Sequence, residues 1–351
     1  MSNPYKSRSV LLSADVIQRL MREQGWTAET LAQKTGLSIG AISNLLNENH
    51  PVYWSTADIL RKAFDLQRID LLLKPAASDC PAVVAKETIH EWSVEQALTG
   101  WITASNQLQF QVCRLQHQHL RRCARGKRYE LRAMSTEEQQ RCRALFIRHA
   151  EVCGVIGSHP HVIRNITTCE SPQKEAWWVI DEWIDGVSLA ETLRETRLTR
   201  SSAFMLAKQI AEGLHALHQA DIVRRELSPQ SILLGREGSH AVLTEFELAK
   251  LLDGSPTVSR DEWPTDPYRA PEASSNDVDL RADIYSWGRL VLHLLLGTLP
   301  LEGQELAAMR KAHLSFDAEK LLLKCVSVSR RSRPKGFADV IEALGSWKGD
   351  S

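Results

Sequence analysis

The sequence predicts a multidomain protein that begins with a small all-α domain. Its 351 residues are enough for two or three domains. Hydrophobic residues make up 43% of the chain and charged residues 25%, which is ordinary for a globular protein. Residues 10–74 carry helix caps and glycine turns at short intervals, whereas the remainder is a much longer region. These observations favour a compact helical domain followed by a larger one.

The first region predicts short helices joined by tight turns. Ser13, Thr27 and Ser38 each precede an apolar-periodic segment and can cap a helix by accepting a backbone N–H. Gly36 suits a left-handed turn, which a residue with a Cβ resists. A fourth helix is expected from about Thr56. A helix, a short glycine turn and a capped helix form a helix-turn-helix.

The segment MREQGWTAETLAQKTGLSIGAISNLLNEN resembles the DNA-binding domain of the Cro and phage-repressor family. The resemblance implies that SIGAISN enters the major groove of a double-stranded DNA operator. There Asn can pair with adenine, and an apolar side chain can contact a thymine methyl. Since such domains normally read DNA as dimers, it also implies a homodimer. The residues expected to face base edges are Ser38, Ile39, Gly40, Ser43 and Asn44.

Charge leaves a second interpretation of this domain open. Residues 1–75 hold nine Lys or Arg and seven Asp or Glu, and the candidate recognition helix has no Lys or Arg. Because phosphate neutralisation supplies most non-specific affinity for DNA, few cations are available for it. We expect Lys34, Arg61 and Lys62 to contact the phosphate backbone. The alternative is a helical domain that binds only protein.

Most of the remaining chain, roughly residues 93–347, resembles a serine/threonine protein kinase domain. The segments that carry the resemblance occur in family order: GLHALHQADIVRRELSPQSILL, LTEFELAKLL, PTDPYRAPEA and RADIYSWGRLVLHLLLGTLPLEG. The resemblance implies an α+β two-lobed kinase-like fold behind the all-α helix-turn-helix domain. The expected boundaries are 1–75 for the DNA-binding domain, 76–92 for a linker, 93–184 for the small lobe and 185–351 for the large lobe.

The positions that handle ATP and metal in the family have changed here. Phosphoryl transfer depends on positioning and on stabilising charge at the transferring group. An Asp-to-Glu change keeps the carboxylate but moves it by about one methylene, and a misplacement of ~1 Å can cost roughly a hundredfold in rate. The residues aligned with the strand Lys, the helix Glu, the catalytic Asp, the following Lys, the metal-binding Asn and the metal-binding Asp are Arg132, His149, Glu226, Ser228, Ser231 and Glu245. The phosphate-covering loop aligns with SNQLQFQV, which has no Gly.

The positions that build the large lobe in the family are kept. By resemblance, Arg225, Phe246, Glu272, Asp283 and Arg333 have structural roles, with Arg333 placed to pair with Glu272. The interpretation is a pseudokinase, in which the scaffold persists and no catalytic residue is expected. If the domain were active, the candidate phosphosites would be Ser255, Thr257, Ser259 and Thr265.

The sequence therefore predicts a cytoplasmic DNA-binding regulator whose kinase-like lobes sense a protein partner or a nucleotide. Seven scattered Cys without a C-x-x-C pair indicate a reducing compartment and no metal site, and no apolar run is long enough for a membrane. No cofactor is expected to be required; the one that the resemblance implies is ATP, without tightly held Mg²⁺. Two alternatives remain: an atypical active kinase that uses Glu226 and Glu245, and a pure protein-interaction scaffold.

Overall fold

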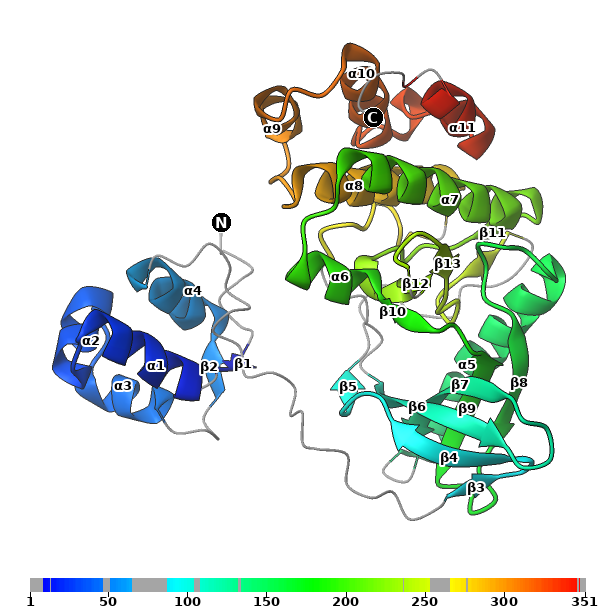
Figure 1. The fold of residues 1–351 in the computed structure, drawn as a ribbon, viewed down its shortest axis with the longest axis horizontal. Helices are drawn as coiled ribbons and strands as arrows, with labels where there is room; N and C mark the ends of the chain where they lie inside the picture. The colour runs from blue at the N-terminus through cyan, green and yellow to red at the C-terminus, as the bar shows by residue number, and fades with distance from the viewer. Residues whose placement is uncertain are drawn as a thin grey trace. The chain divides into compact units, whose positions relative to one another are not determined.

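The chain divides into two compact units, Met1–Ala82 and Val83–Ser351, in this computed structural model. The first is a small helical unit, and the second combines an antiparallel sheet with a helical region (Figure 1). This confirms the multidomain all-α plus α+β layout. The expected boundaries within it stay predictions. The structure describes residues 9–12, 14–46, 51–64, 87–103, 108–131, 134–235, 237–252, 266–275, 277–345 and 347.

Four helices make up most of the described part of the first unit. They are α1 (Ala14–Gln24), α2 (Ala28–Thr35), α3 (Ile39–Leu45) and α4 (Trp54–Ala63). The unit also contains a two-stranded antiparallel ribbon, which the sequence did not predict. Its strands are β1 (Ser9–Leu11) and β2 (Pro51–Tyr53).

Local capping explains where α2 begins and ends and where α3 begins. The Thr27 hydroxyl accepts the Thr30 N–H at 3.3 Å, and the Ser38 hydroxyl accepts the Ala41 N–H at 3.1 Å. Gly36 follows α2 with a φ of 68°. The expected cap at Ser13 lies outside the described residues. The helices enclose a small apolar core that includes Ile17, Met21, Leu31, Ile42, Leu60 and Phe64.

The second unit begins with a seven-stranded antiparallel sheet, the small lobe, in the order β3-β4-β6-β7-β9-β8, with β5 paired to β6. Helix α5 (Thr136–Ile156) packs against β8 and β9, and a capping box between Ser135 and Glu138 starts it. The strands are β3 (Thr88–Ile89), β4 (Trp92–Ala97), β5 (Ile102–Thr103), β6 (Gln109–His117), β7 (Cys123–Glu130), β8 (Asn165–Glu170) and β9 (Ala176–Glu182).

The rest of the unit, the large lobe, is mainly helical. Short strands form two small sheets: β10 (Gly186–Ser188), β12 (Ile232–Gly235) and β13 (Ala241–Leu243) in one, β11 (Ile222–Val223) and β14 (Lys250–Leu251) in the other. The helices are α6 (Leu189–Glu195), α7 (Arg200–Gln219), α8 (Arg281–Leu296), α9 (Glu305–Lys311), α10 (Phe316–Cys325) and α11 (Phe337–Gly345).

Helix α8 is the centre of the large lobe, as the resemblance implied. Nearly all its side chains are buried, and it packs against α7 and α10 (Figure 1). The approach to α10 is close at Gly288, where an added Cβ would lie 2.7 Å from the Cβ of Cys325. Arg333 ties neighbouring loops together: its Nη2 donates to Glu272 Oε2 at 3.1 Å, and its Nη1 to the Arg281 carbonyl at 2.9 Å. Among the described helices, none combines the length and the apolar character needed to cross a membrane.

Candidate functional site

The loop between β11 and β12 is fixed by a buried carboxylate on α8. Asp283 is fully buried and accepts the backbone N–H groups of Arg224 and Arg225, each at 2.8 Å, and the Nε2 of His218 lies 3.0 Å from it. Arg225 has a φ of 67°, a strained left-handed conformation for a residue with a side chain. The Arg225 Nε donates to the Ala273 carbonyl at 2.9 Å, and burial lowers the pKa of Arg225 to about 10. The loop is thus held in one conformation.

The carboxylate at the catalytic position is paired with a guanidinium. Arg269 Nη2 donates to Glu226 Oε1 at 3.1 Å, and the Glu226 side chain is 20% exposed. Arg269 belongs to the segment at 266–275, which follows the undescribed residues 253–265. Glu226 is therefore partly exposed while carrying an internal ion-pair partner.

The two serines that replace the family's Lys and Asn hydrogen-bond within the same loop. The Ser231 hydroxyl donates to the Ser228 carbonyl at 3.0 Å and accepts the Ser228 N–H at 3.2 Å. Ser231 is 2% exposed. Its hydroxyl closes a turn of the loop and is not directed outward as a metal ligand.

The segment after β13 brings two glutamates next to strand β7 of the small lobe. Glu245 has a φ of 63°, and Phe246 after it is fully buried. Arg224 holds this segment: its Nη2 donates to the Thr244 carbonyl at 2.7 Å, and its guanidinium carbon lies 5.0 Å from the Phe246 ring centroid. The segment therefore presents the carboxylates of Glu245 and Glu247 from a rigid backbone.

Lys127 of β7 meets both of these carboxylates. Its Nζ lies 3.2 Å from Glu245 Oε1 and 3.2 Å from Glu247 Oε1, and Lys127 is 3% exposed. The Tyr129 hydroxyl donates to the same Glu247 oxygen at 2.6 Å. We call Lys127, Tyr129, Glu245 and Glu247 the cleft cluster. It connects the small lobe to the large lobe through charged groups that are mostly out of water.

Charge compensation decides the ionisation of this cluster. Burial by itself raises the pKa of Glu247, but the charge of Lys127 and the hydrogen bond from the Tyr129 hydroxyl outweigh it and hold that pKa at about 2. Burial likewise lowers the pKa of Lys127, while Glu245 and Glu247 more than reverse this and raise it. Both partners are consequently ionised at neutral pH.

Sequence reasoning missed Lys127. It gave the strand cation to Arg132, which lies outside the described residues. Lys127 lies within β7, opposite Val179 of β9. The signal in the sequence was Lys127 itself, a cation five residues before Arg132.

His149 on α5 has acquired a different partner from the one its position holds in the family. Its Nε2 lies 3.0 Å from Asp181 Oδ1 on β9, and the Phe246 N–H donates to its Nδ1 at 3.2 Å. Asn165 Nδ2 also donates to Asp181 Oδ1, at 2.9 Å. Because Nδ1 accepts the Phe246 N–H, the imidazole is neutral and its Nε2–H donates to Asp181. Helix α5 is therefore tied to the sheet and to the segment at Phe246 without Lys127.

The groups aligned with the family's magnesium and nucleotide ligands make contacts within the chain. One oxygen each of Glu245 and Glu247 is ion-paired with Lys127, and the Ser231 hydroxyl is hydrogen-bonded to the loop backbone. Arg125, two residues before Lys127 and thus on the same face of β7, adds a guanidinium next to Asp181 in the strand pairing. The four candidate phosphosites and residues 105–107 of the glycine-free loop lie outside the described residues.

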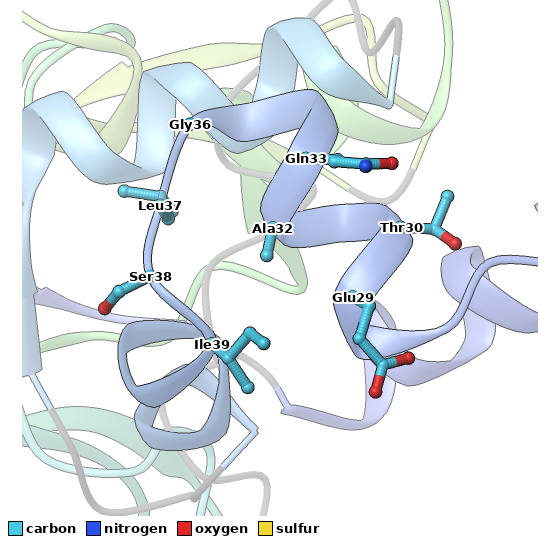
Figure 2. A pocket seen from close by; sticks show the side chains of 8 residues that line it. All are labelled: Glu29, Thr30, Ala32, Gln33, Gly36, Leu37, Ser38 and Ile39. Atoms are coloured by element: carbon cyan, nitrogen blue, oxygen red, sulfur yellow. The ribbon is translucent and has the colours of Figure 1, made fainter.

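The turn between α2 and α3 forms a shallow hollow on the helical unit. Figure 2 shows the side chains of Ser38 and Ile39 at its edge, and Ile39 is 58% exposed. Gly40 and Ser43 are also exposed, and Asn44 lies on α3. The hollow is lined by Glu29, Thr30, Ala32, Gln33, Gly36, Leu37, Ser38 and Ile39. Four of the five expected base readers are therefore accessible to a ligand.

The three expected phosphate contacts already have intramolecular partners. Arg61 Nε and Lys62 Nζ each lie 2.8 Å from a carboxylate oxygen of Asp58, and hydrogen bonds from these two cations lower the pKa of Asp58. Lys34 Nζ lies 4.7 Å from the ring centroid of Trp26. These contacts are at the surface and weak, so replacing them by a contact to a DNA phosphate costs little free energy.

Comparison with known proteins separates the same two regions. Residues 16–73 match the family model described as Cro/C1-type HTH DNA-binding domain, and residues 111–343 match that of the protein kinase domain. The serine/threonine-protein kinase pkn2 of Myxococcus xanthus is 33% identical over 165 residues, which cover 45% of this chain and 20% of that protein. Serine/threonine-protein kinase PkaA of Streptomyces coelicolor is 32% identical over 209 residues, 54% of this chain and 38% of that protein.

A third relative, serine/threonine-protein kinase PknJ of Mycobacterium tuberculosis, is 29% identical over 164 residues, 45% of this chain and 27% of that protein. The chain thus spans 20–38% of the length of these three relatives. The kinase-domain match covers most of the chain, in the region where the two lobes and the cleft cluster lie. The chain belongs to the protein kinase domain family.

Proposed function

We propose that this protein is a DNA-binding regulator whose kinase domain is catalytically impaired and acts as a scaffold that senses a partner protein or a nucleotide. One observation carries the proposal: Lys127 is buried between Glu245 and Glu247. A nucleotide phosphate and Mg²⁺ would compete with these internal contacts for the same groups. Breaking a buried pair costs about 3–5 kcal/mol when one charge is left uncompensated.

The remaining catalytic positions support the same proposal. Glu226 is paired with Arg269, and the hydroxyl of Ser231 is used inside its own loop. The contacts that hold the scaffold, from Asp283 to the loop and from Arg333 to Glu272, are intact. The contacts that position the loops are therefore kept, whereas the side chains at the catalytic positions bind to groups of the chain itself.

DNA binding is the proposed output of the chain. The exposed side of α3 and the hollow before it supply a surface for base edges, and three cations of the helical unit can exchange their partners for phosphates. A homodimer on a two-fold operator would double this weak basic surface.

We expect Asn44→Ala to weaken binding to a duplex selected from a random pool by about 5- to 150-fold, because a bidentate contact to adenine contributes about 1–3 kcal/mol. Gel-shift titration of the full chain at fixed salt measures this. Gln18→Ala, an exposed change on α1, is the matched control and keeps wild-type affinity. Equal affinity of Asn44→Ala and wild type, or affinity that does not fall with salt, would remove DNA reading by α3 from the proposal.

A second candidate function is an atypical serine/threonine kinase, favoured by the names of the relatives and by the retained carboxylates. Glu226 would be the base and Glu245 the metal ligand, with Lys127 moving to the phosphates. Phosphate transfer from labelled ATP that Glu226→Ala abolishes is the result that would replace our proposal with this one.

A further inference from the structure

The cleft cluster places two acidic side chains around a single cationic atom. Glu245 Oε1 and Glu247 Oε1 are both 3.2 Å from Lys127 Nζ, with side-chain exposures of 24% and 6%. Two carboxylates that share a poorly solvated site repel each other, so their ionised forms require a cation between them. In proteins a divalent metal ion often meets this requirement with carboxylate ligands.

The cation at this position is part of the chain. Besides the two carboxylates, the Lys127 ammonium lies 4.1 Å from the centroid of the Phe110 ring and 5.2 Å from that of Tyr129. An aromatic face attracts a desolvated cation, so Phe110 and Tyr129 complete a cage that suits an ammonium. The Tyr129 hydroxyl adds a hydrogen bond to Glu247. Each charged group of the cluster therefore has a partner without any added ion.

From this geometry we infer that Lys127 is a built-in cation that takes the place of a divalent metal ion between Glu245 and Glu247 and joins the two lobes without nucleotide. Lys127 comes from β7 of the small lobe, and the glutamates follow β13 of the large lobe. The inference goes beyond the proposed function, because it concerns what holds the lobes together and not only the missing reaction.

Removing the ammonium should convert the cluster into a divalent-cation site. Lys127→Met keeps an unbranched side chain in the Phe110 cage and leaves the two carboxylates uncompensated. Thermal unfolding of the full chain is measured with and without MnCl₂, together with Mn²⁺ binding by calorimetry. We expect the variant to unfold at a lower temperature than wild type without metal and to regain stability with Mn²⁺. At Mn²⁺ tenfold above its Kd, the ratio of folded to unfolded variant should rise about elevenfold.

Three controls isolate the cluster. Lys311→Met removes an exposed lysine of α9 and should show no response to Mn²⁺ beyond that of wild type. Lys127→Arg should show the same Mn²⁺ response as wild type, since a cation remains between the carboxylates. Lys127→Met combined with Glu245→Gln and Glu247→Gln should lose the Mn²⁺ response, because the ligands are gone.

The wild-type arm tests the inference even if Lys127→Met does not fold. Wild type should bind no Mn²⁺ that depends on Glu245; Mn²⁺ binding by wild type that Glu245→Gln abolishes would overturn the inference. A folded Lys127→Met variant without any Mn²⁺ response would overturn it as well. Incorporation of labelled phosphate is measured in parallel and tests the proposed function. Its result is independent of the thermal-unfolding measurement that tests the inference.

Discussion

Replacing Asp283 with Ala should lower the free energy of unfolding by about 3–5 kcal/mol, one of the largest single effects expected in this chain. Its carboxylate is fully buried and accepts the N–H groups of Arg224 and Arg225. Without it, two buried N–H donors lose their acceptor, and each unsatisfied group costs about 1–3 kcal/mol. His218 loses its partner too.

Urea denaturation of the full chain, followed on the kinase-domain transition, measures this effect. Asp283→Asn should cost less than Asp283→Ala, because one oxygen still accepts an N–H. Asp317→Ala, an exposed change in the first turn of α10, should stay within about 0.5 kcal/mol of wild type. An Asp283→Ala variant as stable as the Asp317→Ala control would show that the loop is held by other contacts.

Glu247 should make the stability of the kinase domain fall steeply in acid. Its pKa is lowered from 4.5 to about 2 in the folded protein. A carboxylate with a depressed folded-state pKa stabilises fully above its unfolded pKa, and this contribution is lost as the pH falls through 4.5 towards 2. In Glu247→Gln, that part of the pH dependence should be absent.

The comparison requires unfolding curves of both proteins between pH 7 and pH 3. We expect the difference in stability between wild type and Glu247→Gln to shrink as the pH falls, because acid removes from wild type what the substitution has already removed. Glu342→Gln on α11 provides an exposed control with the wild-type profile. Parallel curves for wild type and Glu247→Gln would contradict a buried, ionised Glu247.

The helical unit was predictable because its signals are local. Thr27, Gly36 and Ser38 act within four residues of their partners, so their roles follow from the sequence alone. The ribbon of β1 and β2 was not predictable in the same way, because its strands are 40 residues or more apart and gain their pairing only from the fold.

The cleft shows the limit of sequence reasoning more clearly. The degenerate positions could be found by resemblance, but the partners that they acquired could not. Lys127 and Glu247 are 120 residues apart, and His149 and Asp181 are 32 apart. Sequence reasoning named Arg132 and did not weigh Lys127, whose place on β7 opposite Val179 follows only from the strand pairing.

Titration of the full chain with ATP, with and without Mg²⁺, tests most directly whether the cleft engages its own side chains in place of a metal-bound triphosphate. The account predicts that Mg²⁺ does not tighten nucleotide binding and that no labelled phosphate is transferred. A nucleotide affinity that rises tenfold or more with Mg²⁺, accompanied by phosphate incorporation that Glu226→Ala abolishes, would contradict it.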